Sequence, residues 1–189
     1  AVRGFNQNLP EYGYDPARAR SLLAEAGLAG GFTTTLWVNR DAPNWMKVAL
    51  FVQESLRQVG ITVQLKELNY PALLESSGRR ATVPMGTWDW VSAFDDPKET
   101  LDALLNGDNI VDEGCMNTSF YRNARAQQLF RDAVAESNAA RRLEFYRQIE
   151  SQVVEDVPWI FLVQLNIEMM CQPWVKGFTP RGFWPPARL

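Results

Sequence analysis

A strand–helix–strand pattern in residues 32–65 constrains the fold of this chain more than any other feature. The run Phe32–Val38 is β-branched and aromatic, which predicts a strand. Ile61, Val63 and Leu65 alternate with polar residues, which predicts a second, half-buried strand. The segment between them predicts an amphipathic helix, because its apolar residues are spaced three and four apart, at Trp45, Val48, Val52, Leu56 and Val59. A crossover of this length implies a parallel pair of strands with a right-handed connection.

Helix signals occur on both sides of this unit. Asp15 and Pro16 provide a cap and a first residue for a helix that we expect to end at Gly27. Asp96-Pro97-Lys98-Glu99 predicts a capping box and a helix to about Leu105. Further helices are predicted at residues 70–77, 124–136 and 140–156, and strands at 82–90, 158–165, 167–170 and 174–178. The chain of 189 residues therefore predicts one α/β domain with a mixed sheet flanked by helices.

The run 158–165 is nearly all apolar, as in a strand that is buried on both faces. Residues 167–170 are expected to pair with it as a hairpin. We assign Trp37, Trp45 and Trp159 to the core.

Composition and missing motifs exclude several kinds of function. The chain has no His, which removes the commonest general base and metal ligand and rules out a Ser-His-Asp triad. Its net charge is −3 and it has no basic stripe, which argues against nucleic acid as a partner. It contains no phosphate-binding glycine loop, no Gly-x-Ser-x-Gly motif and no apolar run near the ~20 residues of a membrane span. We expect no catalytic residue, no metal site and no cofactor.

The two cysteines leave two alternatives open. Cys115 and Cys171 are too few for a zinc site. They either form a disulfide in an oxidising compartment or stay as free thiols.

The segment from Met85 to Pro97 is the strongest candidate for a binding site. Trp88 and Trp90 are two residues apart, so on a strand they face the same side, which is either core or the wall of a ligand site. The residues that follow are expected to form an irregular loop before a helix, and loops at strand ends are where α/β proteins bind ligands.

Acidic residues in this segment also allow a catalytic reading. Asp89, Asp95 and Asp96 include a candidate carboxylate pair for a glycosidase. A structural reading is favoured, because Asp96 suits a helix cap, Asp95 is favourable near a helix N-terminus and Asp89 can face solvent. Asn117 and Tyr121 are candidate polar contributors for which a structural turn is also favoured. The alternatives kept are therefore a carboxylate-dependent glycosidase and a non-catalytic interaction module.

The chain resembles the family 5 extracellular solute-binding proteins, the receptors of ATP-driven importers of peptides, nickel complexes and opines. The resemblance covers nearly the whole chain, and the order and spacing of its motifs carry it. These motifs are Tyr14–Gly27, Gln53–Val63, Trp88–Pro97, Tyr121–Asn123 with the two helices after it, Pro158–Ile160 and Val175–Phe178.

This resemblance implies the second lobe of a two-lobe, periplasmic-binding-protein-like receptor. Residues 1–189 would form a single ligand-binding lobe, with hinge-proximal or irregular segments at 1–14 and 179–189. The chain would be part of a larger periplasmic or extracellular protein, free or lipid-anchored. It would bind an oligopeptide or peptide-like solute together with the other lobe and deliver it to the membrane subunits of an ABC importer.

The resemblance also implies particular site residues. Asp89, Trp90 and Val91 would form the edge that pairs with the ligand backbone, with Trp90 as the stacking wall and Trp88 as a weaker candidate. Ser92, Ala93 and Asp95 would form the selectivity loop. Members that take free peptides hold the ligand's amino group with an Asp at the place of Ala93, so this chain departs from that pattern. Nickel binding through a protein His is excluded for this lobe.

Overall fold

The computed structural model describes residues 4–163, 170–180 and 187–188, which form two compact units. The unit that we call the sheet unit consists of Glu11–Asp89 and Val111–Thr118. The helical unit consists of Ala1–Pro10, Trp90–Ile110 and Ser119–Leu189. Whether residues 1–189 form one lobe stays a prediction.

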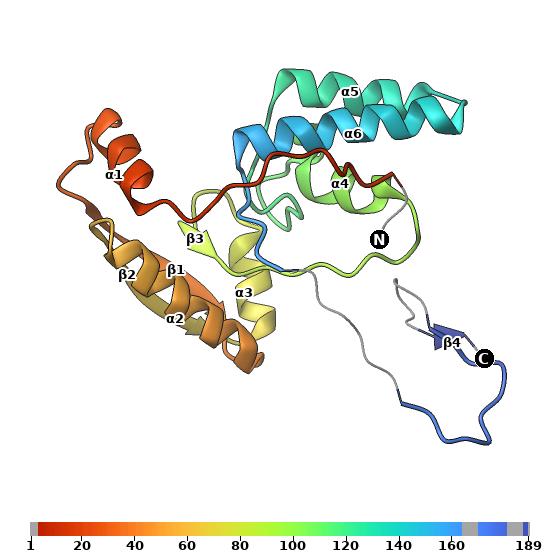
Figure 1. Cartoon of the computed structure of the whole chain (residues 1–189), viewed down its shortest axis with the longest axis horizontal. Coiled ribbons are helices and arrows are strands. Elements are labelled where there is room, and N and C mark those ends of the chain that lie inside the picture. The colour runs from red at the N-terminus through yellow and green to blue at the C-terminus, as the bar shows by residue number, and fades with distance from the viewer. Residues whose placement is uncertain (1–3, 164–169, 181–186, 189) are drawn as a thin grey trace. The chain divides into compact units, whose positions relative to one another are not determined.

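The sheet unit is built on the predicted strand–helix–strand pattern (Figure 1). Strand β1 (Phe32–Asn39) pairs in parallel with β2 (Ile61–Leu68) in a register that runs from Phe32↔Ile61 to Asn39↔Leu68. Helix α2 (Pro43–Arg57) is the crossover and packs along the pair. The predicted parallel pair is therefore confirmed. The buried residues of its core are Leu36, Val38, Ala49 and Val63.

Two further helices belong to the sheet unit. Helix α1 (Pro16–Glu25) is capped by Asp15 as predicted, because the side chain of Asp15 accepts a hydrogen bond from the backbone N–H of Arg18. Helix α3 (Tyr70–Ser77) starts after Asn69 and packs against β1, and its Leu73 is buried.

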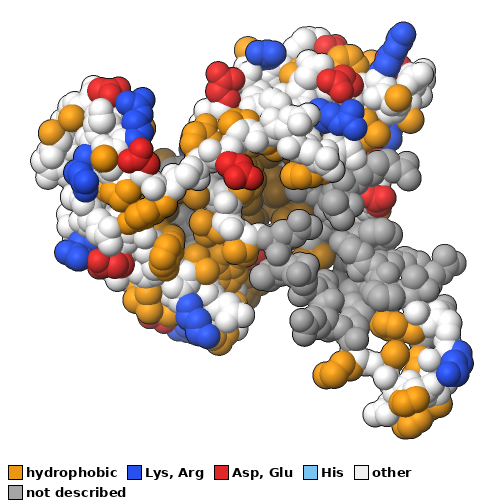
Figure 2. Space-filling view, viewed as in Figure 1, with side chains coloured by type: hydrophobic (Ala, Val, Ile, Leu, Met, Phe, Trp, Pro, Cys, Tyr) orange, Lys and Arg blue, Asp and Glu red, His pale blue; other side chains and the backbone are white. Residues whose placement is uncertain are grey.

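Helix α2 also carries apolar side chains that the sheet unit does not bury. Figure 2 shows hydrophobic side chains gathered over α2 on the viewed face. Phe51 is 71% exposed and Leu50 is 51% exposed.

The third strand is much shorter than the predicted 82–90. Strand β3 is Met85–Gly86 and lies parallel to β1 at the opposite edge from β2, with Leu36↔Met85 and Trp37↔Gly86 in register. Pro84 delays the start of this strand, because proline has no N–H to give to a sheet. Past the bond from the Thr87 N–H to the Trp37 carbonyl, residues 88–91 leave the ladder.

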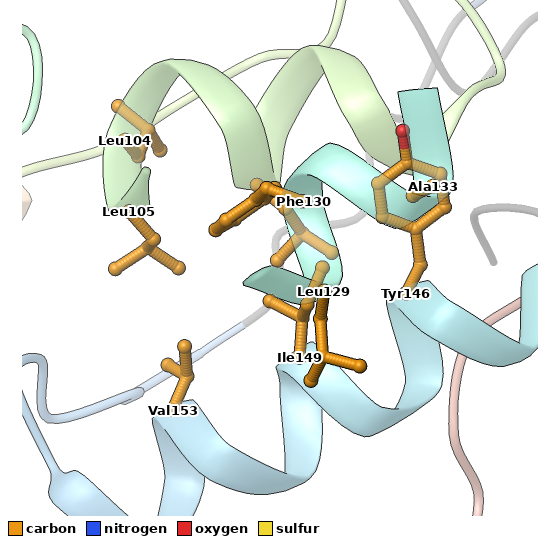
Figure 3. Close-up of a cluster of buried hydrophobic side chains, with 9 residues drawn as sticks. Leu104, Leu105, Leu129, Phe130, Ala133, Tyr146, Ile149 and Val153 are labelled. Atoms are coloured by element: carbon orange, nitrogen blue, oxygen red, sulfur yellow. The ribbon is translucent and has the colours of Figure 1, made fainter. Parts of the chain in front are cut away.

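The helical unit is built from α4 (Pro97–Leu105), α5 (Ala124–Ala135) and α6 (Ala139–Asp156), with a 3₁₀ turn, η1, at Gly107–Asn109. The helices meet through one apolar cluster, shown in Figure 3. Its fully buried members include Phe130, Ala133, Tyr146, Ile149 and Val153. Asn123 and Asn138 cap α5 and α6 by accepting backbone N–H groups of the first turns.

The predictions beyond α6 are largely wrong. Helix α6 ends at Asp156, and the next residue, Val157, has a φ of 48° that turns the chain. Residues 158–163 are irregular and Ile160–Val163 are exposed, because no strand lies beside them among the described residues. Residues 164–169, which include most of the predicted hairpin partner, lie outside the described residues, and Met170 is exposed.

The predicted strand at 174–178 does not form: Trp174 lies in a turn, Gly177 lies in a bend and the residues between them are irregular. Just after it, β4 (Thr179–Pro180) pairs antiparallel with β5 (Ala187–Arg188). Both lie in the segment 179–189, whose assignment to a hinge stays a prediction. In the described part of the chain, no helix has the length and apolar character needed to cross a membrane.

Candidate functional site

The predicted binding segment, Trp88–Asp95, begins where the chain leaves the edge of β1. The backbone N–H and C=O groups of residues 88–91 have no hydrogen-bond partner among the described residues. Unpaired main-chain groups in a row are a template for pairing with another extended chain. Asp89, Val91, Ala93 and Asp95 are exposed along this segment.

The two indoles of the segment are half-buried, so neither is a fully enclosed core residue. Trp90 packs against the apolar cluster of the helical unit, and its Nε1–H donates to Glu99 Oε2 at 3.1 Å. The Nε1 of Trp88 is buried without a hydrogen-bond partner in the described residues, as is the neighbouring Thr87 Oγ1. Of the core assignments, Trp37 is buried, while Trp45 and Trp159 are half-buried against the two apolar clusters.

Helix α4 braces the loop that follows Trp90. The hydroxyl oxygens of Ser92 and Thr100 lie 2.7 Å apart, and Thr100 Oγ1 donates to Glu99 Oε2 at 3.3 Å. Glu99 and Thr100 were not among the predicted site residues. The only sequence signal for them is their position in the first turn of a helix that follows the candidate loop.

The predicted capping box forms only in part. Asp96 Oδ1 accepts the Lys98 N–H at 2.9 Å, as expected for the cap residue. The Asp96 N–H, however, donates to the Phe94 carbonyl, and the Glu99 carboxylate accepts from Trp90 and Thr100 instead. The difference arises because the loop before the helix turns back and supplies its own acceptor for Asp96.

Asp96 also joins two helices of the helical unit. Its Oδ2 accepts from Arg142 on α6 at 2.9 Å. Burial, with the negative charge of Asp96 as a further cause, raises the pKa of the nearby Tyr146 to about 12. A carboxylate engaged by a helix N-terminus and a guanidinium is a structural group, which favours the capping role over a catalytic one. Among the described residues no three His, Cys, Asp or Glu side chains are grouped in a way that would hold a metal ion.

We expect Asp96→Ala to lower the free energy of unfolding by about 1–3 kcal/mol, because it removes a helix cap and a partly exposed ion pair. Asp96→Asn should lose less, since Asn also caps helices. Urea denaturation followed by circular dichroism measures both. The control is Asp89→Ala, at an exposed side chain that makes no hydrogen bond or ion pair with the described residues, which should stay within about 0.5 kcal/mol of the parent. An Asp96→Ala protein as stable as the parent would contradict the capping role.

The other polar candidates have structural roles. Tyr121 donates to Asp156 at the end of α6 at 2.6 Å, and its burial and this hydrogen bond raise the pKa of Tyr121. Asn117 is buried, and its carbonyl accepts from the thiol of Cys115. Cys115 is buried and Cys171 is exposed, and both are free thiols in this structure.

A polar hollow of about 670 Å³ lies in the helical unit. It contains none of the predicted site residues. Its lining residues belong to the N-terminal segment and α6: Phe5, Asn6, Gln7, Asn8, Glu144, Arg147, Gln148 and Ser151.

Comparison with known proteins gives one consistent result. Residues 1–112 match the family model described as bacterial extracellular solute-binding proteins, family 5, middle part. The glutathione-binding protein GsiB of Escherichia coli strain K12 is 30% identical to this chain over 184 residues. These residues are 95% of this chain and 35% of GsiB, so the chain spans about a third of the length of that relative.

Solved structures give the same picture. The periplasmic binding protein DppA from Helicobacter pylori, in complex with the peptide STSA, superposes with a TM-score of 0.75 at 28% identity. It covers 83% of this chain, which corresponds to 30% of DppA. The oligopeptide-binding protein AppA from Bacillus subtilis, in complex with a nonapeptide, has a TM-score of 0.70 at 25% identity over 83% of this chain and 33% of its own. The α/β arrangement of a periplasmic-binding-protein lobe is therefore confirmed.

Proposed function

Because this chain belongs to the bacterial extracellular solute-binding proteins of family 5, we propose that it binds an oligopeptide or peptide-like solute for an ABC importer. Proteins of this family are non-catalytic transport receptors that act in the periplasm or outside the cell, so the glycosidase alternative is not favoured. The proposed site is the segment Trp88–Asp95.

The observation that carries the proposal is the row of unpaired backbone groups at residues 88–91. An extended peptide that pairs with these groups gains main-chain hydrogen bonds that do not depend on its sequence. Trp90 lies in this row and presents an aromatic side chain that is fixed by Glu99. Backbone pairing beside an aromatic wall suits ligands of varied side chains, such as the STSA peptide and the nonapeptide named for DppA and AppA.

Exposed apolar residues support a second lobe as a partner. Ile160 is 72% exposed and Phe161 is 62% exposed, in a run whose composition is that of a buried strand. Such a patch is costly in water and is typical of an interface. We propose that the rest of a longer protein covers it, and that the solute is enclosed between the two lobes, whose closure is read by the importer's membrane subunits.

Ala93 restricts how the amino group of a ligand can be bound. An ammonium group buried beside Ala93 would have no carboxylate from that residue, and an unpaired buried charge costs several kcal/mol. The proposal therefore favours a solute whose amino group is substituted or is held by another residue of the segment. Asp95 is exposed in the same loop and is one such residue.

The test is isothermal titration of the full-length protein against a library of short peptides. We expect binding. We expect Trp90→Ala to raise the dissociation constant of a library hit about 30-fold, since a central Trp commonly contributes about 2 kcal/mol. Trp174→Ala, at an indole that is 74% exposed and outside the segment, is the control and should leave binding unchanged.

Peptides with N-methylated amides test the backbone pairing. Each methyl group removes one main-chain donor, so methylation at a paired position should weaken binding at least 10-fold, while methylation at a neighbouring position should not. A Trp90→Ala protein that folds and binds as tightly as the parent, or a flat methylation scan, would argue against the proposed site.

A further inference from the structure

The hydrogen bonds around Trp90 run in one direction. The carboxylate of Glu99 is an acceptor only, and it receives both the Trp90 Nε1–H and the Thr100 hydroxyl hydrogen. A threonine hydroxyl has a single hydrogen to donate. The 2.7 Å contact between Ser92 and Thr100 and the 3.3 Å contact between Thr100 and Glu99 can both be hydrogen bonds only when Ser92 is the donor of the first, and this is the arrangement we adopt.

This direction determines what the loop can offer to a ligand. The indole N–H of Trp90 and the hydroxyl hydrogen of Ser92 are both used inside the protein. What remains on these two side chains is the face of the indole ring and the lone pairs of Ser92 Oγ. Both attract hydrogen-bond donors or cations and neither can donate to a carboxylate.

We infer that Glu99 is the positioning and specificity-determining residue of the segment, and that it selects a ligand group that donates hydrogen bonds, such as an ammonium or an amide N–H. This inference rests on the proposed function, because it assigns the ligand chemistry of the same site. It also supplies an acceptor, Ser92 Oγ, in a loop that has Ala93 in place of a carboxylate.

The physical basis of the role is preorganisation. A charge-assisted hydrogen bond is stronger than a neutral one, and Trp90 and Glu99 are both half-buried, which limits the competition from water. A ring that is already fixed loses less entropy when a ligand stacks on it. Since Glu99 is in the first turn of α4, the orientation of the ring is tied to a helix rather than to the loop alone.

The first measurement concerns the protein without ligand. The protein is labelled with ¹⁵N at its indole nitrogens, and the Trp90 signal is assigned as the one lost in Trp90→Phe. We expect this N–H to exchange slowly with water in the parent and at least 10-fold faster in Glu99→Ala. Glu99→Gln, which keeps an acceptor oxygen, should retain most of the protection. Lys98→Ala, at the exposed neighbour in the same turn, is the matched control and should change nothing.

The second measurement concerns selectivity. The probes are trialanine amide, which has an ammonium and no carboxylate, and N-acetyl-trialanine, which has a carboxylate and no ammonium. We expect the parent to bind the amide at least 10-fold more tightly, and we expect Glu99→Ala and Ser92→Ala to bring the ratio close to one. Thermal denaturation of each variant separates this change of ratio from a loss of fold.

The two measurements test separate parts of the inference, and each part can be contradicted without the other. A Trp90 indole that exchanges freely in the parent overturns the positioning role even if peptides bind. A parent that prefers the acetylated acid, or a ratio that Glu99→Ala leaves unchanged, overturns the selectivity. If no peptide binds while the indole is protected as expected, the proposed function fails and the positioning of Trp90 by Glu99 stands.

Discussion

Replacing Gly31 by alanine should lower the free energy of unfolding of this protein by roughly 3–5 kcal/mol, the sum of a strained backbone and an overpacked contact. Gly31 has a φ of +71°, a region that side chains of L-residues rarely adopt. A Cβ added there would lie 1.8 Å from the carbonyl oxygen of Gly60. The obstacle is backbone, so no side-chain rotation relieves it.

The position of Gly31 explains why this contact exists. Gly31 precedes β1 and Gly60 precedes β2, and the first residues of the two strands, Phe32 and Ile61, are partners in the parallel register. Gly60 also has a positive φ, of +91°. The two glycines let the chain turn into both strands at the same level, and a side chain on Gly31 would push the strands apart where pairing begins.

The matched control is the neighbouring residue. Gly30 has no positive φ, and a Cβ added there would meet nothing within 4 Å. Gly30→Ala should therefore leave the unfolding free energy within about 0.5 kcal/mol of the parent. Urea titration followed by tryptophan emission compares the two variants, with the buried Trp37 of β1 as a probe of the sheet unit. Equal losses of unfolding free energy in the two variants would show that the contact between Gly31 and Gly60 is not the cause of the destabilisation.

The paired strands illustrate which parts of the fold the sequence can predict. The period of two in Ile61–Leu65 and the spacings of three and four in α2 are local patterns. Each pattern matches the face that the strand or the helix turns towards the core. The caps at Asp15 and Asp96 are local as well, so their roles follow from a few neighbouring residues. The close approach of Gly31 to Gly60 is a tertiary contact, and the sequence pattern shows only that both are turn residues.

The wrong predictions also arise because local patterns do not show tertiary contacts. Residues 158–163 have the composition of a buried strand, but a strand needs a neighbour, and the described residues contain none beside this run. For the candidate site, Trp88–Asp95 is identifiable from its aromatic residues and its place before a helix. The partners Glu99 and Thr100 are not, because Glu99 fits a capping box equally well by sequence.

The helical unit offers the second large effect, at Phe130. This residue is 1% exposed and packs among α4, α5 and α6 with Leu105, Leu129 and Ile149 as fellow members of the cluster (Figure 3). We expect Phe130→Ala to cost about 3–5 kcal/mol of unfolding free energy, because it removes a buried ring and leaves a cavity that three rigid helices fill only in part. Guanidinium denaturation followed by circular dichroism at 222 nm measures the loss.

Val134 provides the control on the same helix. It lies one turn after Phe130 on α5 and is 61% exposed, so Val134→Ala should change the unfolding free energy by no more than about 0.5 kcal/mol.

The same comparison tests the candidate site. Trp90 packs against this cluster, and α4, the helix that carries Glu99, contributes residues to it. At denaturant concentrations where the variant is still folded, Phe130→Ala should speed the exchange of the Trp90 indole N–H with water, whereas Val134→Ala should not. A protein that tolerates Phe130→Ala as well as Val134→Ala would mean that α4 is held by something other than this cluster, and the support for a preorganised Trp90 would then be lost.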